Sequence, residues 1–309
     1  MVTEQKILKL IRRLTPNSKK YLHDDAAVIE KNLVITTDTL VENTHFTLKN
    51  YKPEEIGWKA LAVNLSDIAA MGAKPLYALI SLSLPKSMSD NWISGFYKGL
   101  LACAKRFKTQ IIGGNLARSK EINITITVIG KLATNKITKR SNAKPGDLVF
   151  ASGNFAESAL GLILIKRKIY QFKSLIPAHK TPVPQILSGH EIAKKTKRAA
   201  LMDSSDGLAD CLIQIARESN VKIIVYEDKI PVSYESTKAT EKLRISLLNL
   251  TLYGGEDYKL VGTASKYDCK KLKNIKIIGK VVKGKGAFLK QKNNGLVKLD
   301  VNKAYEHFK

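Results

Sequence analysis

Residues 53–75 read PEEIGWKALAVNLSDIAAMGAKP, and this stretch predicts the helix around which the rest of the fold is organised. Pro53 suits the first helical turn, and Gly72 followed by Pro75 ends the helix. The interior is almost entirely apolar, yet it contains Asp67. A buried carboxylate is costly unless it is paired or bound to a cation. We therefore expect a buried helix whose aspartate has a functional partner.

Outward from this helix, apolar segments alternate between strand and helix patterns. Residues 122–128 alternate isoleucine or valine with asparagine or threonine, which is the clearest strand pattern in the chain. Further strands are expected at 33–37, 76–84, 148–151, 199–202, 223–225, 258–262 and 275–282, and further helices at about 91–107, 155–167, 184–197 and 205–219. This mixture predicts an α/β or α+β fold.

A polar segment, RSNAKPGD at 140–147, contains a Pro-Gly turn and is the predicted domain boundary. It divides the chain into an N-terminal domain of residues 1–138 and a C-terminal domain of residues 139–309. A length of 309 residues accommodates two domains of ordinary size.

The formal net charge of +25 favours contact with nucleic acid or with anionic surfaces. The excess is mostly lysine spread along the chain, and the aromatic residues do not interleave with the basic runs as a stacking platform would. We interpret the charge as solvated lysine-rich faces that would also attract nucleotide phosphates, and we expect no nucleic-acid partner.

The sequence predicts a cytoplasmic protein with no membrane partner. No apolar run reaches the roughly 18–20 residues that a bilayer span requires. Residues 1–14 lack the uninterrupted apolar core of a signal peptide. The three cysteines are isolated and form no CxxC pair, so reduced thiols are expected.

Common nucleotide and metal signatures are missing. The sequence has no GxxxxGK[ST] loop, no GxGxxG after a strand, and no protein-kinase HRD or DFG segment. Its five histidines show no zinc spacing. If the protein uses ATP, it must bind the phosphates by another device.

The informative feature is the placement of the acids. Only 27 aspartates and glutamates occur, and several lie at strand ends or in apolar surroundings: Asp24, Asp25, Asp38, Asp67, Asp203, Asp206, Glu256 and Asp257. Threonine or serine hydroxyls stand beside several of them. Hard divalent cations take such oxygen ligands, and Mg²⁺ commonly bridges carboxylate to phosphate. The set predicts a multi-magnesium nucleotide site rather than a zinc site.

Several of these acids also have a plain structural interpretation. Asp38 follows two threonines and could cap the next segment. Ser205 or Asp206 could be the N-cap of the helix that follows. An N-cap does not explain Asp203, which also stands at a strand end. The acids taken together favour a shared site.

These motifs resemble the thiamine-monophosphate kinase family, in the superfamily of aminoimidazole ribonucleotide synthetase and selenophosphate synthetase. The matching segments follow the family order: DDAAVI (24–29), TTDTLVENTHF (36–46), AVNLSDIAAMGAKP (62–75), GGNLARS (113–119), RSNAKPGD (140–147), DSSDGL (203–208), GGEDYKL (254–260) and AYEHF (304–308). The second and third segments are highly specific, whereas DSSDGL and GGEDY occur in looser form across the superfamily.

The resemblance implies a two-domain aminoimidazole ribonucleotide synthetase-like fold. An N-terminal sheet domain would form a homodimer, and a C-terminal α/β domain would close over the nucleotide. It also implies magnesium-dependent, direct in-line transfer of the ATP γ-phosphoryl group to thiamine monophosphate, the last step of thiamine diphosphate biosynthesis. Both phosphates are anionic, so bridging metal ions would offset their repulsion.

The resemblance also implies roles for individual residues. The expected magnesium ligands are Asp25, Thr36, Thr37, Asp38, Asp67, Asn115, Asp203 and Asp206. The expected ATP contacts are Gly114, Asn115, Arg140 and Ser205, and the expected contacts of thiamine monophosphate are His45, Glu256 and Tyr305. The expected catalytic residues are Asp203, Asp206 and Arg118.

Two substrate contacts can be interpreted further. Glu256 would face the cationic thiazolium ring, and Tyr305 would stack on a ring. Without the resemblance, His45 beside Phe46 could equally be a partly buried side chain with no role in binding. Tyr305, near the C-terminus, would then be interpreted as a docking or surface residue.

One position departs from the family pattern. Where the family usually has Gly-Gly-Asp, this chain has Gly-Gly-Asn at residues 113–115. Asparagine keeps a carbonyl oxygen but loses the charge, which would weaken one metal site. Ser204 is a milder departure, because an apolar residue is common there. The core acids are retained, so we expect an active enzyme.

Two alternative functions are open: another ATP-using enzyme of the superfamily, and a non-catalytic binder of nucleotide or nucleic acid. Selenophosphate synthetases carry a reactive cysteine near the N-terminus, whereas the first cysteine here is Cys103, in a predicted helix. The retained acids argue against a binder, and Asn115 argues for one. A nucleic-acid binder should lose affinity steeply with salt.

Overall fold

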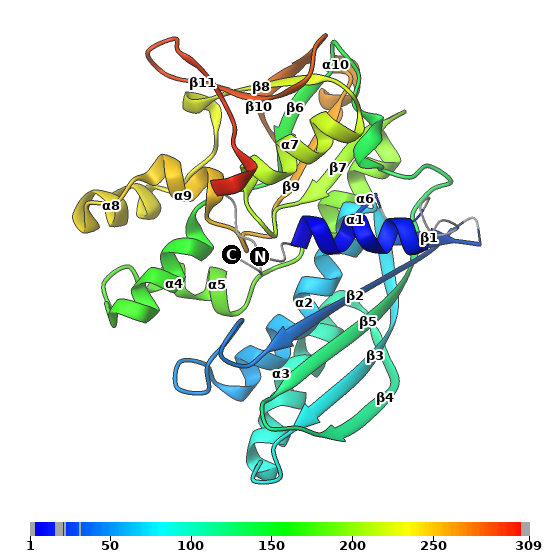
Figure 1. Ribbon diagram of the computed structural model, residues 1–309, viewed down its shortest axis with the longest axis vertical. Helices are drawn as coiled ribbons and strands as arrows, with labels where there is room; N and C mark the ends of the chain where they lie inside the picture. The colour runs from blue at the N-terminus through cyan, green and yellow to red at the C-terminus, as the bar shows by residue number, and fades with distance from the viewer. Residues whose placement is uncertain (1–3, 16–20, 22, 31, 304–309) are drawn as a thin grey trace.

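The computed structural model describes residues 4–15, 21, 23–30 and 32–303 (Figure 1). Two β-sheets lie at opposite ends of the molecule, and helix α2 (Pro53–Ala70) lies between them. Helix α2 packs on β2, β3 and β5 of the first sheet and on β7 of the second. Its residues are buried on nearly all sides, as its apolar sequence predicts.

The first sheet has five strands in the order β1-β2-β5-β3-β4. The strands are β1 (Ala27–Ile29), β2 (Leu33–Val41), β3 (Ala73–Leu84), β4 (Gln110–Arg118) and β5 (Asn123–Leu132). Strands β3 and β4 are parallel, and the other neighbours are antiparallel. Helix α3 (Asp90–Phe107) packs against α2, and the edge strand β4 is exposed along most of its length.

The second sheet has seven strands in the order β12-β11-β8-β10-β6-β9-β7. The strands are β6 (Leu148–Ala151), β7 (Ala199–Asp203), β8 (Lys222–Tyr226), β9 (Leu260–Ala264), β10 (Lys276–Val282), β11 (Gly286–Lys290) and β12 (Leu296–Lys298). Only β8 and β11 pair in parallel. Strand β7 is buried along its whole length, at the edge that meets α2.

The described residues form eight further α-helices. They are α1 (Glu4–Leu14), α4 (Glu157–Arg167), α5 (Ile176–Lys180), α6 (Ile186–Lys195), α7 (Leu208–Glu218), α8 (Tyr234–Leu243), α9 (Leu247–Tyr253) and α10 (Lys266–Cys269). One apolar core joins both sheets, because Phe150, Leu201 and Leu260 cluster with the buried residues of α2. This shared core fixes the two sheets relative to each other.

The mixed α/β fold is confirmed, with two local corrections. The strand expected at 33–37 continues to Val41, so Asp38 lies inside β2 and does not cap a following segment. The helix expected from residue 205 begins at Leu208, and its N-cap is Gly207 with φ 106° and no side-chain cap. Ser205 and Asp206 are therefore not N-cap residues.

Cys103, Cys211 and Cys269 are free and buried. Burial raises the pKa of Cys103 to about 12 and that of Cys269 to about 11. None of the helices in the described part of the chain is long and apolar enough to cross a membrane.

Candidate active site

Three carboxylates converge where the two sheets meet. One oxygen each of Asp25, Asp67 and Asp203 lies within 4.8 Å of the others. Asp25 precedes β1, Asp67 lies on α2, and Asp203 ends β7. We call these three residues the acid group. The fold thus brings together acids from three distant segments that the sequence analysis had assigned to one site.

Hydroxyl groups orient two members of the acid group. Thr36 Oγ1 donates a hydrogen bond of 2.5 Å to Asp67 Oδ2, and Ser66 Oγ donates one of 2.6 Å to Asp203 Oδ2. Asn64 completes the attachment of β2 to α2, because its Oδ1 accepts the Asp38 backbone N–H at 2.9 Å. Each carboxylate is thereby held in one orientation while further lone pairs remain for a cation.

The electrostatics of the acid group are unfavourable for charge without a cation. Burial raises the pKa of Asp67 well above its ordinary value, and the nearby carboxylates of Asp38, Asp203 and Asp25 raise it further. Burial and then Asp25 raise the pKa of Asp203 in the same way. Carboxylate and hydroxyl oxygens without histidine or cysteine suit a hard divalent ion such as Mg²⁺.

Arg140 joins the acid group to the C-terminal half of the chain. Its Nη2 lies 2.9 Å from Asp25 Oδ1, its Nε lies 3.4 Å from Asp25 Oδ2, and its backbone N–H donates to Asp24 Oδ1 at 2.8 Å. Nη1 donates to Gln214 on α7. The Asp25 side chain is only 2% exposed, so this bidentate pair is well shielded from water.

A cleft of about 480 Å³ opens beside the acid group. Its walls come from the β2 end and the loop after it, from α4, and from the segments 203–206 and 254–258. Among the residues that line it are Asp38, His45, Asp67, Asp203, Ser205, Asp206, Gly254, Gly255, Glu256 and Tyr258. His45 is fixed there because its Nδ1 accepts the Val41 backbone N–H at 3.0 Å.

Glu256 reaches this cleft from a backbone in the left-handed region. Gly255 has φ 67° and Glu256 has φ 54°, and the Glu256 N–H donates to Ser205 O at 2.6 Å. Glu256 Oε1 lies 2.8 Å from the Lys59 ammonium, and Oε2 lies 3.1 Å from His179 Nδ1. Burial alone would raise the pKa of Glu256, but Lys59 and His179 together lower it well below its ordinary value.

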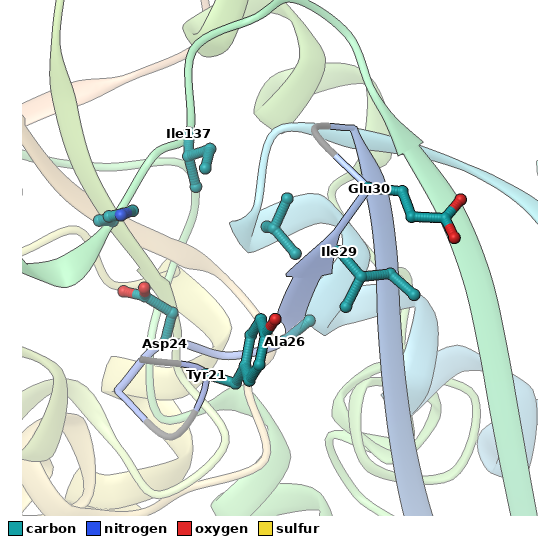
Figure 2. A pocket seen from close by; sticks show the side chains of 8 residues that line it. Tyr21, Asp24, Ala26, Ile29, Glu30 and Ile137 are labelled. Carbon is teal, nitrogen blue, oxygen red and sulfur yellow. The ribbon is translucent and has the colours of Figure 1, made fainter. Parts of the chain in front are cut away.

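A second cavity, of about 300 Å³, lies on the β1 side of the acid group. Figure 2 shows Tyr21, Asp24, Ala26, Ile29, Glu30 and Ile137 around it. Val28 and Lys139 complete the wall. Its lining mixes apolar side chains with the charged residues Asp24, Glu30 and Lys139, and Asp24 is the neighbour in sequence of Asp25.

Some expected site residues lie elsewhere in the single chain. Gly114, Asn115 and Arg118 are on the exposed edge strand β4, where Asn115 pairs with Ser81 of β3. Strands β5 and β3 separate β4 from β2, so at about 4.8 Å per strand β4 is about 14 Å from β2. Thr37 donates to Ile126 O and points away from α2. Tyr305 is outside the described residues.

The structure also adds residues that the sequence analysis missed. Ser66 stands next to Asp67 in the NLSD segment, but its hydroxyl turns to Asp203 in the other half of the chain. Lys59 is a lysine in an apolar helix, which was a usable signal of a buried partner. His179 lies outside all the matching segments, and no local pattern indicated it.

Comparison with known proteins gives one consistent relationship. The family model described as AIR synthase related protein, N-terminal domain, matches residues 23–132. The chain is 37% identical to the thiamine-monophosphate kinase of Aquifex aeolicus over 87% of this chain and 89% of that protein. It is 34% identical to the enzyme of the same name from Bacillus subtilis over 97% and 98%. A solved structure described as AaThiL complexed with AMPPCP and TMP superposes with a TM-score of 0.90 at 34% identity, covering 99% and 97%.

Proposed function

Because the chain belongs to the thiamine-monophosphate kinase family, we propose that its acid group holds Mg²⁺ for a direct phosphoryl transfer. The chain is an ATP-dependent kinase that converts thiamine monophosphate to thiamine diphosphate. The observation that carries the magnesium proposal is the convergence of Asp25, Asp67 and Asp203 within 4.8 Å. Three carboxylates at this distance, one on a buried residue and two on partly buried residues, repel one another unless protons or a cation neutralise them.

We propose that thiamine monophosphate occupies the cleft beside the acid group. His45 and Glu256, both expected substrate contacts, line this cleft together with Asp38 and Asp206. The cleft is large enough for a two-ring molecule of this size. Tyr305 stays a proposed contact on the sequence resemblance alone.

We propose that the nucleotide approaches from the β1 side, where the second cavity lies next to Asp25. Arg140 contacts Asp25 of the acid group, and its neighbour in sequence Lys139 lines this cavity. The guanidinium fork of Arg140 suits phosphate oxygens as well as carboxylate. Ser205 lines the cleft on the other side of the acid group. The two substrates would then meet at the acid group from opposite sides, as an in-line transfer requires.

In this mechanism the protein's work is positioning and charge compensation. Bound Mg²⁺ would neutralise phosphate oxygens of both substrates. Thr36 and Ser66 hold the carboxylates of Asp67 and Asp203 in place, so that little reorganisation accompanies the transfer. Asp206 lines the cleft in which we propose that thiamine monophosphate binds, and it is a proposed catalytic and metal-binding residue.

We propose that the protein acts as a homodimer through the first sheet. Strand β4 is an exposed edge, and Leu116 on it is 73% exposed. An uncovered apolar edge strand is a ready surface for pairing with a second copy. The roles of Gly114, Asn115 and Arg118, which lie about 14 Å from β2 within one chain, depend on this pairing.

The division into residues 1–138 and 139–309 also stays a proposal. Strands β1 to β5 all precede residue 139 and β6 to β12 all follow it, which supports two units. The shared core between α2 and the second sheet indicates that the units pack as one body. The cytoplasmic location expected from the sequence stays a prediction.

The test is ADP release by the purified protein with ATP and Mg²⁺, with and without thiamine monophosphate. Release that requires thiamine monophosphate, with thiamine diphosphate as product and loss of rate in Asp206→Asn, supports the proposal. Equal rates in magnesium and in excess chelator would overturn the metal role. A solution mass equal to one chain would overturn the homodimer.

A further inference from the structure

Lys59 is a fully buried lysine that the mechanism above does not use. It lies on α2 with 0% exposure, and its ammonium is 2.8 Å from Glu256 Oε1. The Tyr51 ring centroid lies 5.8 Å from the same nitrogen. Burying an ammonium group costs free energy unless the group is paired. We therefore infer that the role of Lys59 lies in its contact with the Glu256 carboxylate.

The second oxygen of Glu256 is held as well. His179 is 3% exposed, and its Nδ1 lies 3.1 Å from Oε2 and 3.0 Å from Ser158 Oγ. Burial and then Lys59 lower the pKa of His179, so the ring is neutral near pH 7 and donates from Nδ1 without adding charge. Each carboxylate oxygen of Glu256 therefore contacts one protein side chain: Oε1 contacts Lys59 and Oε2 contacts His179.

The side chain of Glu256 is nevertheless 29% exposed, and the residue lines the cleft. Each carboxylate oxygen has two lone pairs, so each keeps acceptor capacity toward a ligand. The charge of Glu256 is already balanced by Lys59, however. A ligand in the cleft would meet a dipole rather than a net negative charge, and the field of a dipole falls off faster with distance.

We propose that Lys59 and His179 hold Glu256 as a fixed hydrogen-bond acceptor that selects the pyrimidine amino group of thiamine monophosphate, and not as a counter-ion for the thiazolium ring. This inference rests on the proposed binding of thiamine monophosphate in the cleft. Lys59 and His179 are positioning residues, because they act through Glu256.

The first test compares thiamine monophosphate with the analogue in which an oxo group replaces the pyrimidine amino group. Calorimetric binding and kcat/KM are measured for the wild type and for Glu256→Gln. The wild type should prefer thiamine monophosphate over the oxo analogue by at least about 100-fold. In the analogue, the oxo group and the Glu256 carboxylate are both hydrogen-bond acceptors, so neither is paired. The glutamine amide can also donate, so the variant should discriminate by less than about 10-fold.

The second test separates positioning from folding by comparing Lys59→Met with the double variant Lys59→Met/Glu256→Gln. The single variant should lose thermal stability and raise the KM for thiamine monophosphate about 10-fold or more, with the KM for ATP unchanged. The double variant removes the uncompensated charge, so its stability should recover while discrimination stays lost. Lys195→Met, which removes the exposed pair with Glu191, is the matched control and should match the wild type.

The outcomes separate this inference from the proposed function. Equal binding of the two ligands by the wild type, or full discrimination in Glu256→Gln, would overturn the inference. Recovery of both stability and discrimination in the double variant would also overturn it and leave Lys59 a structural residue. Selective binding without any ADP release would support the inference and reject the proposed function.

Discussion

The Ser66 hydroxyl on α2 donates a hydrogen bond of 2.6 Å to Asp203, which lies 137 residues further along the chain at the end of β7. Both residues are buried. The neighbouring residue Asp67 belongs to the acid group, so one turn of α2 supplies one member of this group and orients another. The two halves of the chain therefore meet at the site through a direct side-chain contact.

Ser66→Ala should lower the free energy of unfolding by about 1.5–3 kcal/mol, the usual worth of a hydrogen bond to a charged group. Because Asp203 would lose its orientation, the Mg²⁺ concentration for half-maximal rate should also rise. Urea unfolding and magnesium titration of the rate measure the two effects. Ser119→Ala, on a half-buried residue whose hydroxyl donates to the backbone oxygen of nearby Glu121, is the control. Unchanged magnesium dependence in Ser66→Ala would contradict the orienting role.

Asp67→Asn should change stability in opposite directions with and without Mg²⁺. In chelator, the variant should unfold at a higher temperature than the wild type, because one of three converging carboxylates is gone and Thr36 can still donate to the amide oxygen. In Mg²⁺ the wild type should gain stability and the variant should gain much less. Scanning calorimetry in chelator and in Mg²⁺ measures both. A wild type that Mg²⁺ does not stabilise would contradict a metal site at the acid group.

Arg140→Lys should raise the KM for ATP by roughly 10-fold or more, because lysine cannot form the bidentate pair with Asp25 or keep the bond to Gln214 at the same time. The KM for thiamine monophosphate should change little. Steady-state kinetics with each substrate varied give both constants. Arg217→Lys, on an arginine that is 56% exposed and paired with Glu218, should leave both constants unchanged. Equal changes in both constants would indicate a general structural defect.

The contribution of Glu256 to the free energy of unfolding should decrease as the pH falls. The folded pKa of Glu256 lies below its ordinary value of 4.5, because Lys59 and His179 outweigh the effect of burial. Such a group stabilises the fold fully above about pH 4.5, and this contribution is lost as the pH falls through the folded pKa. The difference in unfolding free energy between the wild type and Glu256→Gln should therefore shrink below pH 4.5. Urea unfolding from pH 7 to pH 3 measures this difference, and a constant difference would refute the ion pair.

Leu116→Arg should dissociate the proposed homodimer, because it places a charge on an exposed edge strand that would be buried by pairing. Light scattering after gel filtration measures the mass. Leu187→Arg, on an α6 residue that is 85% exposed, is the matched control and should stay dimeric. If Leu116→Arg keeps the wild-type mass, β4 is not the dimer interface.

Much of this fold follows from local patterns. Helix α2 was predicted within one residue at its end, because proline, glycine and a long apolar run define it. Strand β6 was predicted with its observed bounds. Strand β2 was predicted too short, because Thr37 and Asp38 look like a strand end when the ladder partner β5 is unknown.

The site was predictable in composition but not in geometry. The sequence predicts one site for the acids of the acid group because they lie at strand ends or in apolar surroundings beside hydroxyl groups, and the resemblance to a family pattern supports this. The partners that orient them were less visible, since Ser66 and Asp203 are neighbours only in three dimensions. His179 could not be predicted from the sequence, because only the three-dimensional structure shows that this histidine on a short helix contacts Glu256. The position of Asn115 on an edge strand could not be predicted either, because it depends on the order of the strands in the sheet.

The burial of all three cysteines has a practical consequence for chemical labelling. The pKa of each thiol is raised, because burial disfavours the thiolate, and alkylating reagents attack the thiolate rather than the thiol. A maleimide dye added to the folded protein should therefore leave Cys103, Cys211 and Cys269 unmodified. One cysteine introduced on an exposed surface, such as the outer face of α6, would then carry the only fluorophore. Substrate-linked motion could be followed in an otherwise native background, without first removing any natural thiol.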